Sequence, residues 1–123
     1  MGLQKSIVAV DDSRIMLTTL ESMLSEQYEF RGFAKAERGL KYIEQFPPSL
    51  IILDIDMPDM DGYTMLGRIK ENIALGDIPV IFLTSNNEKD YKTKAVEHGA
   101  NDYVVKPIDQ EILLSKIEAL LLT

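Results

Sequence analysis

Four short runs of consecutive apolar residues constrain the fold of this chain more than any other feature. They do not alternate with polar residues, and they are Ile7–Val10, Leu50–Leu53, Val80–Leu83 and Tyr103–Val105. Continuous apolar runs of this length are typical of strands buried on both faces of a sheet. A fifth segment, Tyr28–Ala34, mixes polar and apolar residues, as a strand near a sheet edge does. The sequence therefore predicts five strands, four of them covered on both faces.

The segments between these strands have apolar residues at helical spacing. The first begins at Arg14 with Ser13 as its cap, and its apolar positions are Ile15, Leu17, Leu20, Met23 and Leu24. The second and third carry Leu40, Ile43 and Phe46 before Pro47, and Leu66, Ile69 and Ile73 before Gly76. Three helices are therefore expected in the first two thirds of the chain.

Two further helices are predicted towards the C-terminus. Residues Glu88–His98 form a weakly apolar helix, for which Gly99 is placed as the C-terminal cap. The last helix runs from Asp109 to about Leu122 and buries Leu113, Ile117, Leu120 and Leu121. Ile112 and Ala119 give this last helix a second apolar side, which we interpret as a partner surface.

Alternation of five strands with five helices predicts a parallel sheet covered on both sides. The expected fold class is a doubly wound α/β sandwich, formed by residues 1–123 as one domain. Ligands bind such sheets beyond the C-terminal ends of the strands, so the residues at those ends are the candidates for function.

Polar residues that suit phosphoryl chemistry collect at the predicted strand ends. Asp11 and Asp12 follow the first strand and Asp54 ends the third, while Thr84 and Lys106 follow the fourth and fifth. Each residue alone is an ordinary cap or loop residue. Together they offer carboxylate oxygens for Mg²⁺, and a hydroxyl and an ammonium for a phosphoryl group.

This set of motifs resembles the receiver domain of two-component response regulators, the family that includes the chemotaxis-type single-domain regulators. The resemblance covers nearly the whole chain. It rests on Asp11-Asp12, on Asp54 within LDIDMPDMDG, on Thr84, and on Tyr103-Val-Val-Lys-Pro107. It implies the five-stranded, flavodoxin-like fold of receivers.

The resemblance also implies a role for each matched residue. Asp54 is the phosphoacceptor, and Mg²⁺ or Mn²⁺ is held by Asp11, Asp12, Asp54 and the backbone carbonyl of Asp56. Lys106 pairs with a phosphate oxygen. The Lys106-Pro107 peptide bond is cis in the family. Thr84 turns towards the phosphoryl group, and Tyr103 then moves inward to change the surface between the fourth and fifth helices. Such a domain catalyses its own phosphorylation and slow dephosphorylation.

The other aspartates of LDIDMPDMDG have separate expected places. Asp59 and Asp61 belong to the turn into the third helix, which Asp61-Gly62 helps to start. The side chain of Asp56 and that of Asn86 lie where family members tune the loss of the phosphoryl group. His98, the single histidine, is expected at the surface.

Other readings of these residues remain open to different degrees. A haloacid-dehalogenase-type phosphatase shares the D-x-D of Asp54-Ile-Asp56, but that motif belongs after its first strand, and Pro58 stands where Thr or Val is needed. Pro58 also breaks a calcium-loop pattern. A nucleotide-binding domain needs a phosphate-binding loop where Asp11-Asp12 stands. A non-phosphorylated pseudo-receiver that only binds partners is the strongest alternative.

Composition limits the partners and the compartment. A net charge of −7, with 13 Lys and Arg in no basic run, disfavours direct binding to nucleic acid or to anionic membranes. Cysteine is absent and no apolar stretch reaches a membrane span, so we expect a cytoplasmic protein. The expected partners are a sensor histidine kinase or phosphotransfer protein and a downstream protein target or effector domain. The chain itself is expected to be a monomer or a phosphorylation-promoted homodimer.

Overall fold

The computed structural model describes residues 4–85 and 97–122, and these contain one five-stranded parallel sheet. The strand order is β2-β1-β3-β4-β5. The strands are β1 (Ser6–Val10), β2 (Glu29–Phe33), β3 (Leu50–Asp54), β4 (Val80–Thr84) and β5 (Asp102–Val105). Each neighbouring pair is parallel, which confirms the predicted doubly wound α/β fold.

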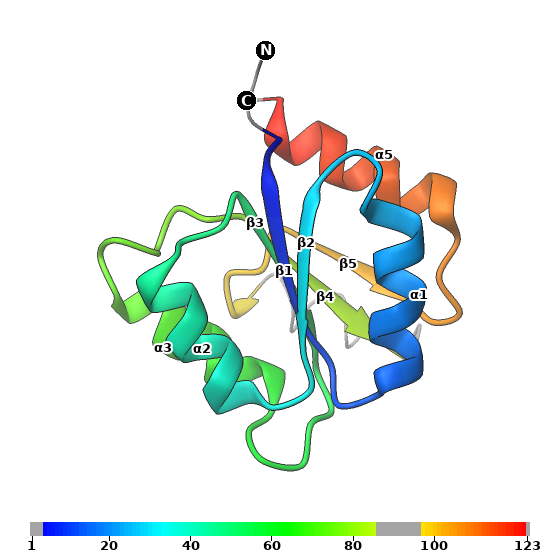
Figure 1. The fold of residues 1–123 in the computed structure, drawn as a ribbon. Helices are drawn as coiled ribbons and strands as arrows, with labels where there is room; N and C mark the ends of the chain where they lie inside the picture. The colour runs from blue at the N-terminus through cyan, green and yellow to red at the C-terminus, as the bar shows by residue number, and fades with distance from the viewer. Residues whose placement is uncertain (1–3, 86–96, 123) are drawn as a thin grey trace.

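Four helices cover the sheet within the described residues, and two of them lie on each face (Figure 1). They are α1 (Arg14–Leu24), α2 (Ala36–Gln45), α3 (Gly62–Glu71) and α5 (Gln110–Leu121). The helix predicted over Glu88–His98 falls almost wholly within residues 86–96, outside the described part of the chain. Gly99, its expected cap, has a φ of 96°, a conformation that glycine adopts without a Cβ clash.

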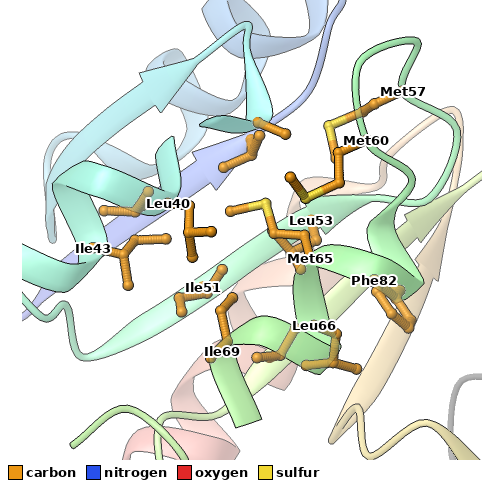
Figure 2. Close-up of a cluster of buried hydrophobic side chains, with 14 of the residues drawn as sticks. Leu40, Ile43, Ile51, Leu53, Met57, Met60, Met65, Leu66, Ile69 and Phe82 are labelled. Atoms are coloured by element: carbon orange, nitrogen blue, oxygen red, sulfur yellow. The ribbon is translucent and has the colours of Figure 1, made fainter. Parts of the chain in front are cut away.

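The side chains of each strand alternate between two hydrophobic clusters, one on either face. Leu20 and Leu24 of α1 pack with Leu113 and Ile117 of α5 on one face. On the other face α2 and α3 pack against the strands, and the close-up in Figure 2 draws this cluster. Its labelled side chains are Leu40, Ile43, Ile51, Leu53, Met57, Met60, Met65, Leu66, Ile69 and Phe82. A sheet covered on both faces explains why the central strands read as unbroken apolar runs.

Three of the four described helices, α1, α3 and α5, start where the sequence predicts. Ser13, Asp61 and Asp109 each accept a hydrogen bond from the main-chain nitrogen three residues ahead, at 3.2, 2.9 and 3.2 Å. These bonds satisfy N–H groups that the first turn of a helix leaves without a partner. Within the described residues no helix is both long enough and apolar enough to cross a membrane.

Several details of the predicted core are wrong. β5 is an edge strand in which Val104 is buried and Tyr103 partly buried, and Leu120 and Leu121 of α5, predicted as buried, are only partly buried. Ile15 is 81% exposed because it lies on the side of α1 opposite to Leu20 and Leu24. Phe46 and Ile73 are 61% and 98% exposed, since α2 and α3 end before them and the chain leaves the helical path.

Candidate functional site

All five strands are parallel, so the C-terminal ends of β1, β3, β4 and β5 lie together at one end of the sheet. β1 lies between β2 and β3, so consecutive connections leave it in opposite directions and open a crevice at its C-terminal end. Asp11 directly follows β1, and Asp54 is the last residue of β3. Thr84 ends β4 beside Val105, whose next residue is Lys106. The five residues predicted from strand ends, including Asp12, therefore share one edge.

Lys106 joins the two buried carboxylates of this site. Its Nζ lies 3.1 Å from Asp11 Oδ2 and 3.4 Å from Asp54 Oδ1. Asp11 is fully buried and Asp54 is 4% exposed, whereas the Lys106 side chain is 22% exposed. One ammonium thus lies against two carboxylates that water hardly reaches, which leaves an excess of buried negative charge.

A third carboxylate completes an acidic group that suits a divalent cation. Asp11, Asp12 and Asp54 each offer an oxygen, and these oxygens lie within 4.8 Å of one another. Asp11 Oδ2 is buried and receives no hydrogen bond of normal geometry, although Lys106 lies near it. A donor set made only of oxygens is what Mg²⁺ prefers. The residues therefore fit the expected ion.

The charges of the site alter the protonation of Asp54 and Lys106. Burial, and then the negative charge of Asp11, raise the pKa of Asp54 to about 7, although Lys106 opposes this. Burial alone would lower the pKa of Lys106, but hydrogen bonding and the charges of Asp11 and Asp54 raise it overall. Lys106 is therefore charged at neutral pH, while Asp54 exchanges its proton in the same pH range. A cation at the carboxylates would take the place of that proton.

Gly62, the first residue of α3, lies close against the main chain of Asp54 and Ile55. Its N–H donates to Ile55 O at 2.8 Å. A Cβ at this position would lie 2.6 Å from Asp54 O and 2.9 Å from Ile55 Cα, so no larger residue fits without a shift of backbone. The predicted start of the helix at Asp61-Gly62 is confirmed, and the glycine has the further task of letting α3 approach the site.

The loop between β3 and α3 is anchored to the core on its far side. Met57 and Met60 are 7% and 9% exposed, and Figure 2 shows them reaching into the cluster that holds Leu53 and Met65. Asp56 is exposed, and its N–H lies 3.4 Å from Asp54 Oδ1. The side chain of Asp56 is not part of the acidic group of Asp11, Asp12 and Asp54.

Asp59 lies in the loop that leads into α3, as predicted, but its side chain has a partner that the sequence did not indicate. Its Oδ2 accepts a hydrogen bond at 2.9 Å from the N–H of Ala36, the first residue of α2, rather than serving the turn into α3. Lys35, the formal cap of α2, makes no side-chain capping bond. Asp59 therefore caps a helix 23 residues earlier in the chain, and no local spacing in the sequence indicates such a contact.

The predicted switch residues lie on neighbouring strands. Thr84 is buried at the end of β4, and Tyr103 is half-buried on β5, where it pairs with Phe82. The Lys106-Pro107 peptide bond is cis, as the family resemblance implies. His98 is exposed, as predicted, and its ring lies 4.5 Å from that of Tyr63. Asn86 lies outside the described residues.

Comparison with known proteins gives one consistent family. Residues 7–118 match the family model described as the response regulator receiver domain. The chain is 35% identical over 117 residues to the transcriptional regulatory protein AfsQ1 of Streptomyces coelicolor, covering 94% of this chain and 51% of that protein. It is 35% identical over 114 residues to a probable cyclic di-GMP phosphodiesterase of Vibrio cholerae, covering 93% and 26%. The chain thus spans about half or less of these curated relatives.

The fold agrees with a solved structure over almost the whole of this chain. The crystal structure of a putative response regulator from Chloroflexus aurantiacus superposes with a TM-score of 0.93 at 30% sequence identity. The match covers 98% of this chain and 100% of that one.

Proposed function

Since this chain belongs to the family of response regulator receiver domains of two-component systems, we propose that it is a switch turned on by phosphorylation of Asp54. The observation that carries the proposal is the place of Asp54 at the end of β3. Its Oδ1 lies 3.4 Å from Lys106 Nζ, and its carboxylate shares an acidic group with Asp11 and Asp12. A nucleophile, its counter-charge and a set of metal ligands therefore meet at one point.

In the proposed reaction an oxygen of ionised Asp54 attacks phosphorus in line with the leaving group. A P–O bond to Asp54 forms as the P–N bond of a phosphohistidine breaks, and the imidazole departs with the electron pair and takes a proton from solvent. The chain positions the nucleophile through the contact of Gly62 with the Asp54 backbone. Positioning and charge neutralisation are the main contributions a protein makes to phosphoryl transfer.

Asp11, Asp12 and Asp54, with the backbone carbonyl of Asp56, would hold Mg²⁺ or Mn²⁺. The ion would neutralise carboxylates and phosphoryl oxygens that otherwise repel each other. Two unscreened unit charges 4 Å apart repel by about 4 kcal/mol at an effective dielectric near 20, which explains why neutralisation matters here. The buried Asp11 Oδ2, whose contact with Lys106 Nζ at 3.1 Å lacks normal hydrogen-bond geometry, supports this assignment.

Lys106 would bind one phosphoryl oxygen and Thr84 another. Lys106 already lies between the two buried carboxylates, so a small movement of its ammonium brings it to a group on Asp54. Phosphorylation adds a charge of about −1.5 to −2 and three acceptor oxygens. We propose that Thr84 follows the new acceptors and that Tyr103 moves inward, which changes the surface formed by β5 and α5.

The proposed partners are a sensor histidine kinase or phosphotransfer protein as donor, and a protein target or effector domain as output. Relatives that include a transcriptional regulatory protein and a probable phosphodiesterase support an output that differs among them. We propose a cytoplasmic location and one receiver domain over residues 1–123. The domain would transfer a phosphoryl group to itself and hydrolyse it slowly.

Intact-mass spectrometry after incubation with acetyl phosphate and Mg²⁺ tests this function. The wild-type protein should gain one phosphoryl group that is lost at high pH. Asp54→Asn should gain none, whereas the matched control Asp77→Asn, an exposed aspartate between α3 and β4, should still be modified. An unmodified wild type, or an equally modified Asp54→Asn, would refute the proposal and favour the pseudo-receiver.

A further inference from the structure

A lysine of α5 reaches the open edge of β5. β5 is the last strand in the sheet order, so no described strand covers its outer edge. Lys116 Nζ lies 2.8 Å from Asp102 Oδ1 and donates to Tyr103 O at 2.9 Å. The same nitrogen lies 4.9 Å from the centre of the Tyr103 ring. Three contacts from one ammonium thus converge on two consecutive residues of β5.

The main chain of Tyr103 is held by side chains through both of its polar groups. Its N–H donates to Asp102 Oδ1 at 2.8 Å, and its C=O accepts from Lys116. Asp102 therefore binds Lys116 and the Tyr103 N–H with the same oxygen atom. An edge strand whose polar groups are occupied in this way is less available for pairing with another chain.

Partial burial of Lys116 and an open space beside Tyr103 allow these contacts to influence the position of the ring. The side chains of Lys116 and Asp102 are 28% and 31% exposed, so their interaction is screened less than that of a fully exposed pair. A surface hollow of about 230 Å³ borders Tyr103, Ile112 and Lys116. The half-buried ring is therefore not enclosed on every side, and specific contacts help to set its position.

We propose that Lys116 is a positioning residue that holds Tyr103 and the edge of β5 in the resting arrangement. The inference rests on the proposed function, because it takes Tyr103 as the residue that moves after phosphorylation. The ammonium lies 4.9 Å from the centre of the ring, and a ring that moved inward towards Thr84 would leave this contact. A cation on a tyrosine face is worth about 1 kcal/mol, which corresponds to a factor of about five in the population of the two ring positions. Loss of Lys116 should shift the switch towards the phosphorylated arrangement by about that factor.

The first test observes the ring directly in protein that carries no phosphoryl group. Lys116→Met keeps the apolar stem but removes the charge and the donors, whereas Lys116→Arg keeps both. Nuclear magnetic resonance of ring-labelled tyrosine resolves Tyr103 among the five tyrosines, with Tyr103→Phe to assign it. The Tyr103 signals of Lys116→Met should move in the direction that phosphorylation moves them in the wild type, and Lys116→Arg should stay near the wild type.

A matched control separates this effect from the loss of any lysine. Lys70 of α3 is also partly buried and donates to a main-chain oxygen, that of Gly76 at 2.9 Å. Lys70→Met should leave the Tyr103 signals in place. Should Lys116→Met fail to fold, Asp102→Asn weakens the same ion pair while keeping an oxygen acceptor, and it should move the signals in the same direction by less.

The second test measures the equilibrium through a phosphoryl mimic. Coupling between two sites is reciprocal, so a variant that favours the activated arrangement binds the mimic more tightly. Lys116→Met should bind beryllofluoride with Mg²⁺ about fivefold more tightly, while Lys116→Arg and Lys70→Met should stay within about twofold of the wild type. Unmoved Tyr103 signals in Lys116→Met, or equal shifts in Lys116→Met and Lys116→Arg, would overturn the proposal. Failure of the wild type to bind the mimic or accept a phosphoryl group would instead refute the proposed function. Tyr103 signals that stay unmoved in Lys116→Met would then still show that Lys116 does not position the ring.

Discussion

Asp59 Oδ2 lies 2.9 Å from the main-chain nitrogen of Ala36, so an aspartate of the β3–α3 loop caps the N-terminus of α2. This bond joins the loop that follows Asp54 to a helix from an earlier part of the chain. Arg68 of α3 and Glu37 of α2 form a second link at 3.2 Å, but both side chains are more than half exposed. The partly buried cap is therefore the stronger tie between the loop and α2.

Removal of this cap should destabilise the protein measurably. Asp59→Ala leaves the first N–H of α2 without its acceptor, and we expect a loss of about 1 kcal/mol in the free energy of unfolding. Asp59→Asn keeps an oxygen acceptor and should lose less. Urea unfolding followed by circular dichroism measures both, with the exposed Asp56→Ala as control. Equal stability of Asp59→Ala and Asp56→Ala would contradict the capping role.

Substitution of Gly62 should damage both the fold and the site. A methyl group in Gly62→Ala meets Asp54 O at 2.6 Å, and we expect a destabilisation of about 1–3 kcal/mol from the forced shift of backbone. Because the shifted atoms belong to Asp54, the proposed phosphoacceptor, the rate of phosphorylation by acetyl phosphate should fall as well.

Gly67 of the same helix provides a matched control for Gly62. Apart from the adjacent residues and backbone of its own helix, no atom lies within 4 Å of a Cβ built there, so Gly67→Ala should raise stability by about 0.5–1 kcal/mol through the higher helix propensity of alanine. A comparison of unfolding midpoints and phosphorylation rates tests the pair. Similar behaviour of the two variants would show that the close contact at Gly62 is unimportant.

The raised pKa of Asp54 predicts how stability depends on pH in the absence of metal. Its pKa is about 7 in the folded protein against an ordinary value of 3.8, so the folded state binds more protons between these values. The contribution of Asp54 is therefore present below about pH 4 and is lost as the pH rises to about 7. In EDTA, the wild type should lose stability relative to Asp54→Asn over this range.

Mg²⁺ should reverse this trend because it requires ionised Asp54. The stabilisation that Mg²⁺ gives to the wild type should be larger at pH 8 than at pH 6. Calorimetric titration at both pH values measures the affinity directly. An affinity that is the same at pH 6 and pH 8 would mean that Asp54 does not exchange a proton for the metal.

Lys106→Ala should separate metal binding from switching. Loss of a positive charge beside Asp11 and Asp54 should leave Mg²⁺ affinity equal to or higher than that of the wild type. The same variant lacks the ammonium that would bind the phosphoryl oxygen, so beryllofluoride should no longer shift the Tyr103 signals. Titration calorimetry and ring-labelled tyrosine spectra test the two halves. A normal Tyr103 response in Lys106→Ala would contradict the role given to Lys106.

The exposed apolar side of α5 predicts a phosphorylation-promoted dimer. Ile112 is 51% exposed and Ala119 is exposed on the same helix. Sedimentation velocity should detect a larger species with beryllofluoride and Mg²⁺, and Ile112→Asp should abolish it. Ile73→Asp is the control, because Ile73 is 98% exposed in the loop after α3. A monomer under all conditions would remove the dimer from the proposed function.

Much of the fold follows from local pattern, because its determinants lie within a few residues of each other. The caps Ser13, Asp61 and Asp109 bond three residues ahead, so spacing alone locates them. Unbroken apolar runs predict β1, β3 and β4 since both faces of these strands are covered. Apolar spacing fails at Ile15 and Ile73, because it does not reveal which side of a helix faces the sheet or where the helix ends.

In the candidate site too, some features follow from the sequence and others only from the tertiary structure. The sequence by itself determined which residue types end each strand, and hence that Asp11, Asp12, Asp54, Thr84 and Lys106 belong to one edge of a parallel sheet. Only the tertiary structure decided that Lys106 lies between the buried carboxylates of Asp11 and Asp54, of which the nearer in sequence is 52 residues away. It also decided that Asp59 caps the N-terminus of α2. These contacts depend on how separate helices pack against the sheet, and that packing minimises the exposed surface of the whole molecule rather than obeying any local rule.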